Sequence, residues 1–200
     1  MTSAIDLDLV SRLADQLAAG EPGDTGMLFA ANDIVPPTVL WDPTLDRMDS
    51  KSLDFLIDYW SDAAGTQPMP APERIDPVGL RPALGRLLVC EPIDGATDFR
   101  IRLYGSGLAL EMGRDLTGSR ISEIQPGSYV TTFFLACYRA VALRGAPLFT
   151  RHQPSAASFA SDIKRLLLPF GTGGEVTRIL VGVDALMKRP LGRPNWQRRL

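Results

Sequence analysis

Residues 98–106 form a stretch with one apolar side and one basic or polar side. Phe99, Ile101 and Leu103 alternate with Arg100, Arg102 and Tyr104. Because successive side chains of a β-strand point to opposite faces, this alternation predicts a strand whose apolar face lies against a core. The strand ends at Gly105, and a short segment closed by Gly113 and Gly118 follows. Such a strand requires partner strands and a covering layer, so the chain is restricted to folds that contain a sheet.

Hydrophobic periodicity predicts the remaining elements. Helices are expected over 4–19, 50–63 and 129–143, where apolar residues recur at helical spacing. Strands are expected over 87–91, 98–104, 147–152, 163–170 and 176–185, with short helical turns over 106–125. This order predicts an α+β fold, in which a five-stranded antiparallel sheet has the long helix 129–143 and the short helices on one face, preceded by the N-terminal helices.

Composition divides the chain into three expected parts. Residues 1–49 combine an amphipathic helix with an irregular linker that contains prolines, and 50–186 hold all the predicted strands. The tail 187–200 carries five bases and no acid, and we expect it to be mobile. Residues 1–80 have a net charge of −10 and residues 81–200 one of +8. Either the acidic part docks on the basic part, or the two surfaces are separately solvated.

The sequence contains no segment expected to cross a membrane or to direct secretion. Its longest nearly apolar run, 133–143, is interrupted by Arg139 and is shorter than the ~20 residues of a spanning helix. The N-terminus has acids and lacks the basic region that begins a secretory signal. We therefore expect a cytoplasmic protein without a membrane span. No DNA-binding motif accompanies the net charge of −2, so nucleic acid is not an expected partner.

Several of these motifs, taken in order, resemble the PAS fold and in particular a bacterial PAS-like family of small sensory domains. They include Tyr59-Trp60, the connector 70–77, Leu84, and the segments 99–105, 113–118 and 166–170. The resemblance covers about residues 50–186. It implies a sensory module without catalytic activity, and it does not identify the ligand.

The resemblance also bears on cofactors. Photosensory flavin domains of the PAS superfamily have a reactive cysteine just after a Gly-Arg pair, in the segment that matches 113–118. In this chain Gly113-Arg-Asp is followed by Leu116, and neither Cys90 nor Cys137 lies in the segment 113–118. No cysteinyl–flavin adduct is therefore expected. Haem-binding PAS domains have a histidine on the long helix, whereas the only histidine, His152, falls on the next strand. We predict no cofactor and, with one histidine and two separated cysteines, no metal site.

A ligand pocket is expected between the sheet and helix 129–143. The candidate lining residues are Phe99, Ile101, Leu103, Met112, Phe134, Cys137 and Tyr138. A site for a small molecule needs mainly apolar walls with a few polar anchors, and the hydroxyl of Tyr104 or Tyr138 would supply one. The alternative is that these side chains simply fill the core.

Three arginines form a second candidate site. The guanidinium groups of Arg100, Arg102 and Arg114 would bind an anion such as a carboxylate or phosphate. The alternative is that they pair with acids of the same chain, for which the candidates are Asp76, Glu111 and Asp115.

The sequence leaves three hypotheses of function. The first is a sensory module that binds an unknown small molecule and passes the change to a signalling partner by a population shift. The second is a ligand-free scaffold that forms a homodimer through helices 4–19 and 50–63. The third is a small cone-shaped α+β enzyme of the ketosteroid-isomerase-like class. Catalysis is not expected, because there is no Gly-x-Ser-x-Gly elbow and any Ser/His scheme would depend on His152 alone.

Overall fold

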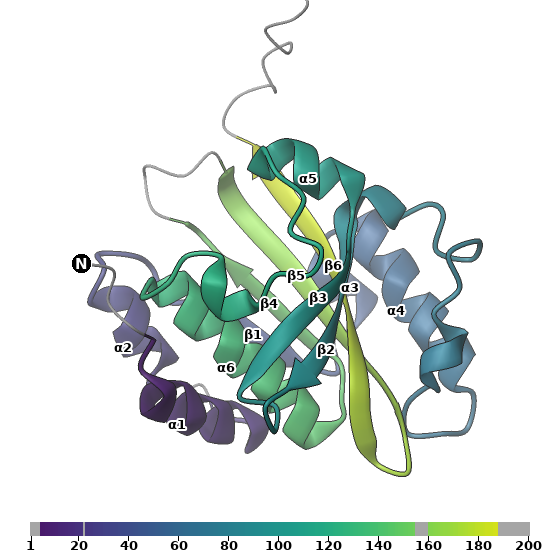
Figure 1. Ribbon diagram of the computed structural model, residues 1–200, viewed down its shortest axis with the longest axis horizontal. Coiled ribbons are helices and arrows are strands. Elements are labelled where there is room, and N and C mark those ends of the chain that lie inside the picture. The colour runs from purple at the N-terminus through teal and green to yellow at the C-terminus, as the bar shows by residue number, and fades with distance from the viewer. Residues whose placement is uncertain (1–4, 22, 155–159, 188–200) are drawn as a thin grey trace, which may run out of the picture.

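A six-stranded antiparallel sheet forms the centre of the molecule (Figure 1). The computed structural model describes residues 5–21, 23–154 and 160–187. The strands are β1 Thr38–Trp41, β2 Leu87–Ile93, β3 Asp98–Tyr104, β4 Leu148–His152, β5 Ala160–Thr172 and β6 Glu175–Met187, in the spatial order β1-β4-β5-β6-β2-β3. The predicted α+β class with an antiparallel sheet is confirmed, with one strand more than the five expected. The basic tail lies outside the described residues from 188 onward.

The helices occupy both faces of the sheet. They are α1 Leu7–Ala18, α2 Thr25–Ala30, α3 Leu45–Met48, α4 Lys51–Ala64, α5 Ser106–Met112 and α6 Tyr129–Arg144, with 3-10 turns η1 Pro72–Arg74, η2 Leu84–Arg86 and η3 Ile121–Glu123. α6 lies across one face with α1 packed on its outer side, and α4 lies on the opposite face (Figure 1). Among the described helices, none is long and apolar enough to cross a membrane.

Burial on both faces explains the continuous apolar run in β5. Leu167 belongs to the core under α6, whereas Leu166 and Leu168 belong to the core under α4. Because alternate side chains of a strand point to opposite faces, a strand covered on both sides has no solvated positions to mark its period. The two-layer arrangement predicted from the sequence is therefore a three-layer one, since α4 buries Leu53, Leu56 and Ile57 on the second face.

The sixth strand lies in the segment that the sequence marked as a linker. β1 pairs with β4, from Thr38 opposite Arg151 to Trp41 opposite Leu148. The Trp41 indole donates a hydrogen bond of 2.8 Å to the carbonyl of Leu17 in α1, and the Arg144 guanidinium lies 4.6 Å from the centre of its ring. The N-terminal helix is thus joined to the sheet edge and to α6. The proposed division of the chain near residues 49 and 187 stays a prediction.

Helix ends follow the capping residues in the sequence. The Ser50 hydroxyl accepts from the Leu53 amide at the start of α4 and donates to Asp184 of β6 at 2.6 Å. Ser128 caps α6 in the same way, and α6 ends at Gly145, whose φ of 67° is the left-handed value that glycine adopts without strain. These caps fix where α4 and α6 begin relative to the sheet.

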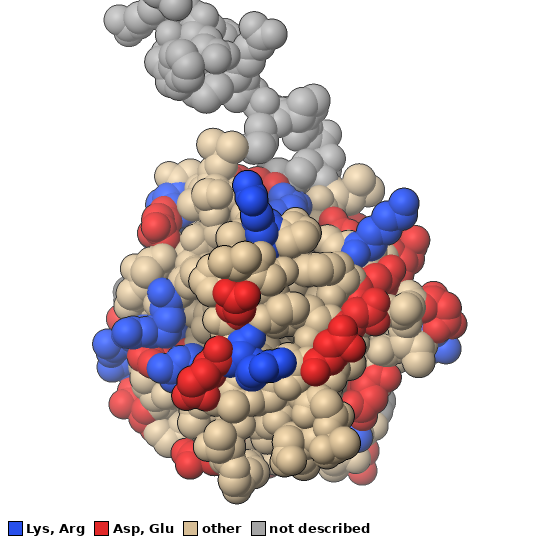
Figure 2. Space-filling model, turned by 90° about the vertical axis from the view of Figure 1, so that its right-hand side faces the viewer, with Lys and Arg blue, Asp and Glu red and all other residues tan. Residues whose placement is uncertain are grey.

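The charged side chains of the two parts of opposite net charge form few ion pairs with each other. Figure 2 shows a row of acidic side chains on the right of its view, and α4 carries Asp54, Asp58 and Asp62 at intervals of one helical turn. Across the described part of the chain, one salt bridge joins residues 1–80 to the rest, between Asp49 and Lys164 at 3.1 Å. Docking of the acidic part on Arg100 and Arg102 is not observed.

Gly105, which ends β3, is required by a close backbone approach. A Cβ atom at this position would lie 2.6 Å from the carbonyl oxygen of Leu84 and 2.7 Å from the backbone of Gly85. We predict that Gly105→Ala lowers the free energy of unfolding by about 1–3 kcal/mol, since backbone atoms must shift. Gly85→Ala, whose Cβ would meet only ordinary contacts at 3.7 Å and beyond, is the control. Equal stability of the two variants in urea unfolding would contradict this account.

Candidate functional site

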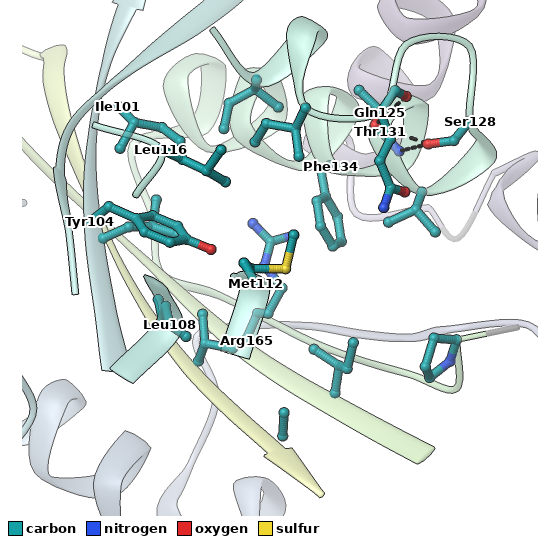
Figure 3. A pocket seen from close by; sticks show the side chains of 18 of the residues that line it. Ile101, Tyr104, Leu108, Met112, Leu116, Gln125, Ser128, Thr131, Phe134 and Arg165 are labelled. Atoms are coloured by element: carbon teal, nitrogen blue, oxygen red, sulfur yellow. Dashed lines mark hydrogen bonds between the residues drawn. The ribbon is translucent and has the colours of Figure 1, made fainter. Parts of the chain in front are cut away.

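A cavity of about 450 Å³ lies between the sheet and α6, on the side where α5 and the segment 113–128 cover the sheet (Figure 3). The sheet contributes Leu88, Ile101, Tyr104, His152, Ile163, Arg165, Val183 and Ala185, with Pro154 beyond β4. The cover contributes Leu108, Glu111, Met112, Leu116, Ile121, Ile124, Gln125 and Ser128, and α6 contributes Tyr129, Val130, Thr131, Phe134 and Tyr138. The walls are mainly apolar with a few polar groups, as in sites for small molecules.

Four of the seven residues expected to line a pocket do so: Ile101, Met112, Phe134 and Tyr138. Phe99 and Cys137 are fully buried in the adjoining core instead. The Phe99 ring lies 5.2 Å from that of Tyr138, so Phe99 supports a wall of the cavity from behind.

A β-bulge moves the seventh residue, Leu103, to the other face. Val89 pairs with Leu103, but Cys90 pairs with Ile101, so Arg102 is an extra residue in β3. One extra residue reverses the alternation that follows it. Leu103 therefore packs with the core under α4, and Tyr104 takes its place facing the cavity (Figure 3). Burial raises the pKa of Tyr104 to about 12, with a further contribution from Glu111, so its hydroxyl is a neutral donor.

Arg165 of β5 lines the cavity with a buried cation and was missed by the sequence reasoning. Its side chain is only 3% exposed, and its Cζ lies 3.7 Å from the centre of the Phe134 ring and 5.2 Å from that of Tyr138. Nη2 donates to the Tyr138 hydroxyl at 2.9 Å, while Nη1 is buried without a hydrogen-bond partner. No carboxylate of the described residues forms a salt bridge with it. Burial of an unpaired guanidinium is costly, since it does not lose its proton.

The polar groups beside Arg165 on β4 are also unpartnered. Thr150 stands opposite Arg165 in the sheet register, and its Oγ1 is buried without a hydrogen bond. Both ring nitrogens of His152 are likewise buried without a hydrogen-bond partner. The His152 ring packs against Phe133 and Phe134 at centroid distances of 5.9 and 5.6 Å. His152 and Arg165 line the cavity, whereas Thr150 does not. Beside Arg165 the described chain therefore leaves hydrogen-bonding groups unused.

The start of α6 forms a second polar corner, whose groups satisfy one another. The Ser128 hydroxyl donates to Thr131 Oγ1 at 2.9 Å, and the Thr131 hydroxyl donates to the carbonyl of Gln125 at 2.9 Å. Glu111, the carboxylate that lines the cavity, pairs with Arg86 of η2. These groups hold the cover in place, because their bonds tie α5 and α6 to their surroundings.

The three arginines predicted as an anion site have separate contacts within the chain. Arg102 lies 3.5 Å from Glu91 on the neighbouring strand, and Arg114 donates to the carbonyl of Ile124 at 3.3 Å. Arg100 faces Arg120 in an isolated backbone bridge, and its Nε is buried without a partner.

The acids predicted as partners for those arginines bind elsewhere. Asp76 accepts from the backbone amides of Val78 and Gly79, both at 3.0 Å. Asp115 accepts from the amide and the hydroxyl of Thr117, and these bonds lower its pKa. Glu111 pairs with Arg86. The expected pairings were wrong because they rested on charge alone, whereas the nearest groups decide which ion pairs form.

Both cysteines are buried thiols that do not line the cavity. Burial raises the pKa of Cys90 and of Cys137 to about 12, so neither is a reactive thiolate near neutral pH. Within the described ranges, no group of three or more His, Cys, Asp or Glu residues is placed to hold a metal ion.

The long helix across an antiparallel sheet, with a cavity between them, places the chain among small α+β domains in which helices cover a sheet. A family model described as PAS domain matches residues 48–183. The chain therefore belongs to the PAS domain family, whose members are in general sensory or regulatory modules. No curated protein and no solved structure matches the chain.

The buried imidazole of His152 makes stability depend on pH. Burial, and then the charge of Arg165, lower the pKa of His152 to about 4 from its ordinary value of 6.5. Above pH 6.5 the imidazole is neutral in both states and adds no pH dependence to the stability. Below pH 6.5 the imidazole takes up a proton in the unfolded chain but stays neutral in the folded chain. The free energy of unfolding therefore falls progressively down to pH 4, by about 3 kcal/mol.

We predict that wild type loses about 3 kcal/mol more than His152→Phe between pH 7 and pH 4, because phenylalanine cannot take up the proton. Urea unfolding followed by circular dichroism at several pH values measures the difference. The carboxylates titrate in both proteins, so they cancel in the comparison. Parallel stability curves would show that His152 is not held neutral by the fold.

Proposed function

We propose that this chain is a non-catalytic sensory module that binds a small molecule in the cavity beneath α6. The cavity itself carries the proposal: its volume of about 450 Å³ lies within the roughly 300–1,000 Å³ of small-molecule sites, and its walls are apolar with a few polar anchors. Membership of the PAS domain family supports a sensory role.

The cover of the cavity gives such a module a means of response. α5, η3 and the loops between them contribute Leu108, Met112, Leu116 and Ile121 to the walls. A ligand that prefers one packing of this cover on the sheet shifts the population toward it and changes the surface that a signalling partner meets. Leu110, on the outer side of α5, is 62% exposed and would move with the cover.

The two other hypotheses find less support in the structure. The homodimer hypothesis used the apolar faces of helices 4–19 and 50–63, but α1 buries Leu13 and Leu17 and α4 buries Leu53 inside the chain. A dimer would have to use other surfaces. The enzyme hypothesis requires an available acid or a nucleophile–base pair. Among the described cavity residues, Glu111 is paired with Arg86 and His152 has no hydrogen-bonded nucleophile.

A neutral fluorescent probe tests whether the cavity is open. We predict that N-phenyl-1-naphthylamine binds at one saturable site, and that at 100 times its Kd it adds about 2.7 kcal/mol to stability. Met112→Trp, which narrows the cavity, weakens binding at least tenfold. Leu110→Trp, on the exposed side of the same helix, leaves it unchanged. Absence of saturable binding, or equal effects of the two substitutions, would contradict the proposal.

Hydrogen exchange tests whether binding reaches the cover. With the same probe bound, amides of residues 105–128 are expected to exchange more slowly, because the ligand fixes the packing of α5 and η3 on the sheet. Amides of α4, on the opposite face of the sheet, serve as the internal reference. Equal changes in both regions would indicate general stabilisation without a local response.

A further inference from the structure

The buried cation of Arg165 restricts the ligand beyond its size. The guanidinium lies over the ring faces of Phe134 and Tyr138, which line the cavity with it, and no acid of the described chain pairs with it. Figure 3 shows it directed into the same space as Tyr104, Met112 and Phe134. A charge kept in an apolar site without a partner favours an anion, since Coulomb attraction is strongest where water is scarce.

The hydrogen-bonding geometry favours a planar acceptor. Nη1 has two N–H groups without a partner, and Nη2 uses one of its own on Tyr138. The guanidinium therefore keeps N–H groups that the described chain does not use, and a guanidinium can donate a pair of such bonds to the two oxygens of a carboxylate. The Tyr104 hydroxyl, which points into the cavity from β3 (Figure 3), is a further donor for the same group.

The rest of the wall limits the ligand to a single negative charge. Leu108, Leu116, Ile163 and Val183 supply apolar surface around the arginine, and Glu111, although paired with Arg86, would repel a second negative charge. A ligand with one carboxylate and an apolar body would satisfy both kinds of wall.

Resting on the proposed function, we propose that the cavity binds a small organic monocarboxylate, with the carboxylate on Arg165 and the apolar body against α5 and α6. Three of the described residues contribute unpartnered buried polar atoms in this part of the sheet, Thr150, His152 and Arg165. Native interiors contain few such groups. Two of the three, His152 and Arg165, line the cavity, so unused hydrogen-bonding groups lie beside the proposed ligand.

Two probes of the same shape test the proposal at pH 7.5. We expect 2-naphthoate to displace N-phenyl-1-naphthylamine from wild type at least tenfold more effectively than neutral 2-naphthamide, since hydrogen bonds to charged groups are the stronger. Arg165→Met removes this preference, and Arg165→Lys, which keeps the charge without the planar fork, retains part of it. Arg151→Met, which removes a cation from the neighbouring strand where it pairs with Asp162, leaves the preference intact.

Folding is separated from binding in the same variants. Because the unpaired charge destabilises the free protein, Arg165→Met should unfold at the same temperature as wild type or higher, and should still bind N-phenyl-1-naphthylamine. Equal displacement by 2-naphthoate and 2-naphthamide would overturn the proposal while leaving the proposed function standing. A tenfold preference for 2-naphthyl phosphate over 2-naphthoate would also overturn the monocarboxylate proposal. The same holds if Arg165→Met still prefers 2-naphthoate over 2-naphthamide. If the neutral probe does not bind wild type at all, the proposed function itself fails.

Discussion

Burial of the sheet on both faces is the constraint from which the remaining features follow. β5 directs Leu167 toward α6, and it directs Leu166 and Leu168 toward α4. Helices on both sides therefore bury the apolar surface of the central strands. α4 closes one face with a packed core. α6 crosses the other face, and on the side away from α1 the space is covered by α5 and the segment 113–128, which leave a cavity.

Burying the charged side chain of Arg165 in this interior costs folding free energy. On a strand with both faces covered, two consecutive basic residues must point to opposite interiors. Lys164 reaches the carboxylate of Asp49 at 3.1 Å, whereas Arg165 contacts two aromatic faces and one hydroxyl in the described part of the chain. The two neighbours therefore differ: Lys164 is paired with a carboxylate, and Arg165 forms no salt bridge with any described residue. An interior selected for stability alone would hold an apolar side chain there.

Much of the fold was predictable because its signals are local. The helical periodicity over 50–63 and 129–143 located α4 and α6 closely, and the ordered motifs indicated the PAS fold. β1 was missed because its pairing with β4 is remote in sequence and prolines surround it. Leu103 was misplaced because the bulge at Arg102 reverses the face, which no alternation pattern reveals.

The candidate site was only partly accessible from sequence for a related reason. Ile101, Phe134 and Tyr138 were expected to line it, since their spacing places them on inward faces. Arg165 was overlooked because a basic residue before an apolar run reads as the solvated end of a strand. The signal that could have found it is the pair Lys164-Arg165 inside a strand covered on both sides, where one base has to point toward each helical layer.

In the proposed site, the buried guanidinium of Arg165 binds the carboxylate of the ligand. A crystal structure of the protein with 2-naphthoate tests it most directly. The account predicts the carboxylate oxygens at hydrogen-bond distance, about 2.7–3.1 Å, from Nη1 and Nη2 of Arg165, with the rings between α5 and α6. A naphthoate that lies in the cavity with its carboxylate turned away from Arg165, or that binds outside the cavity, would contradict it.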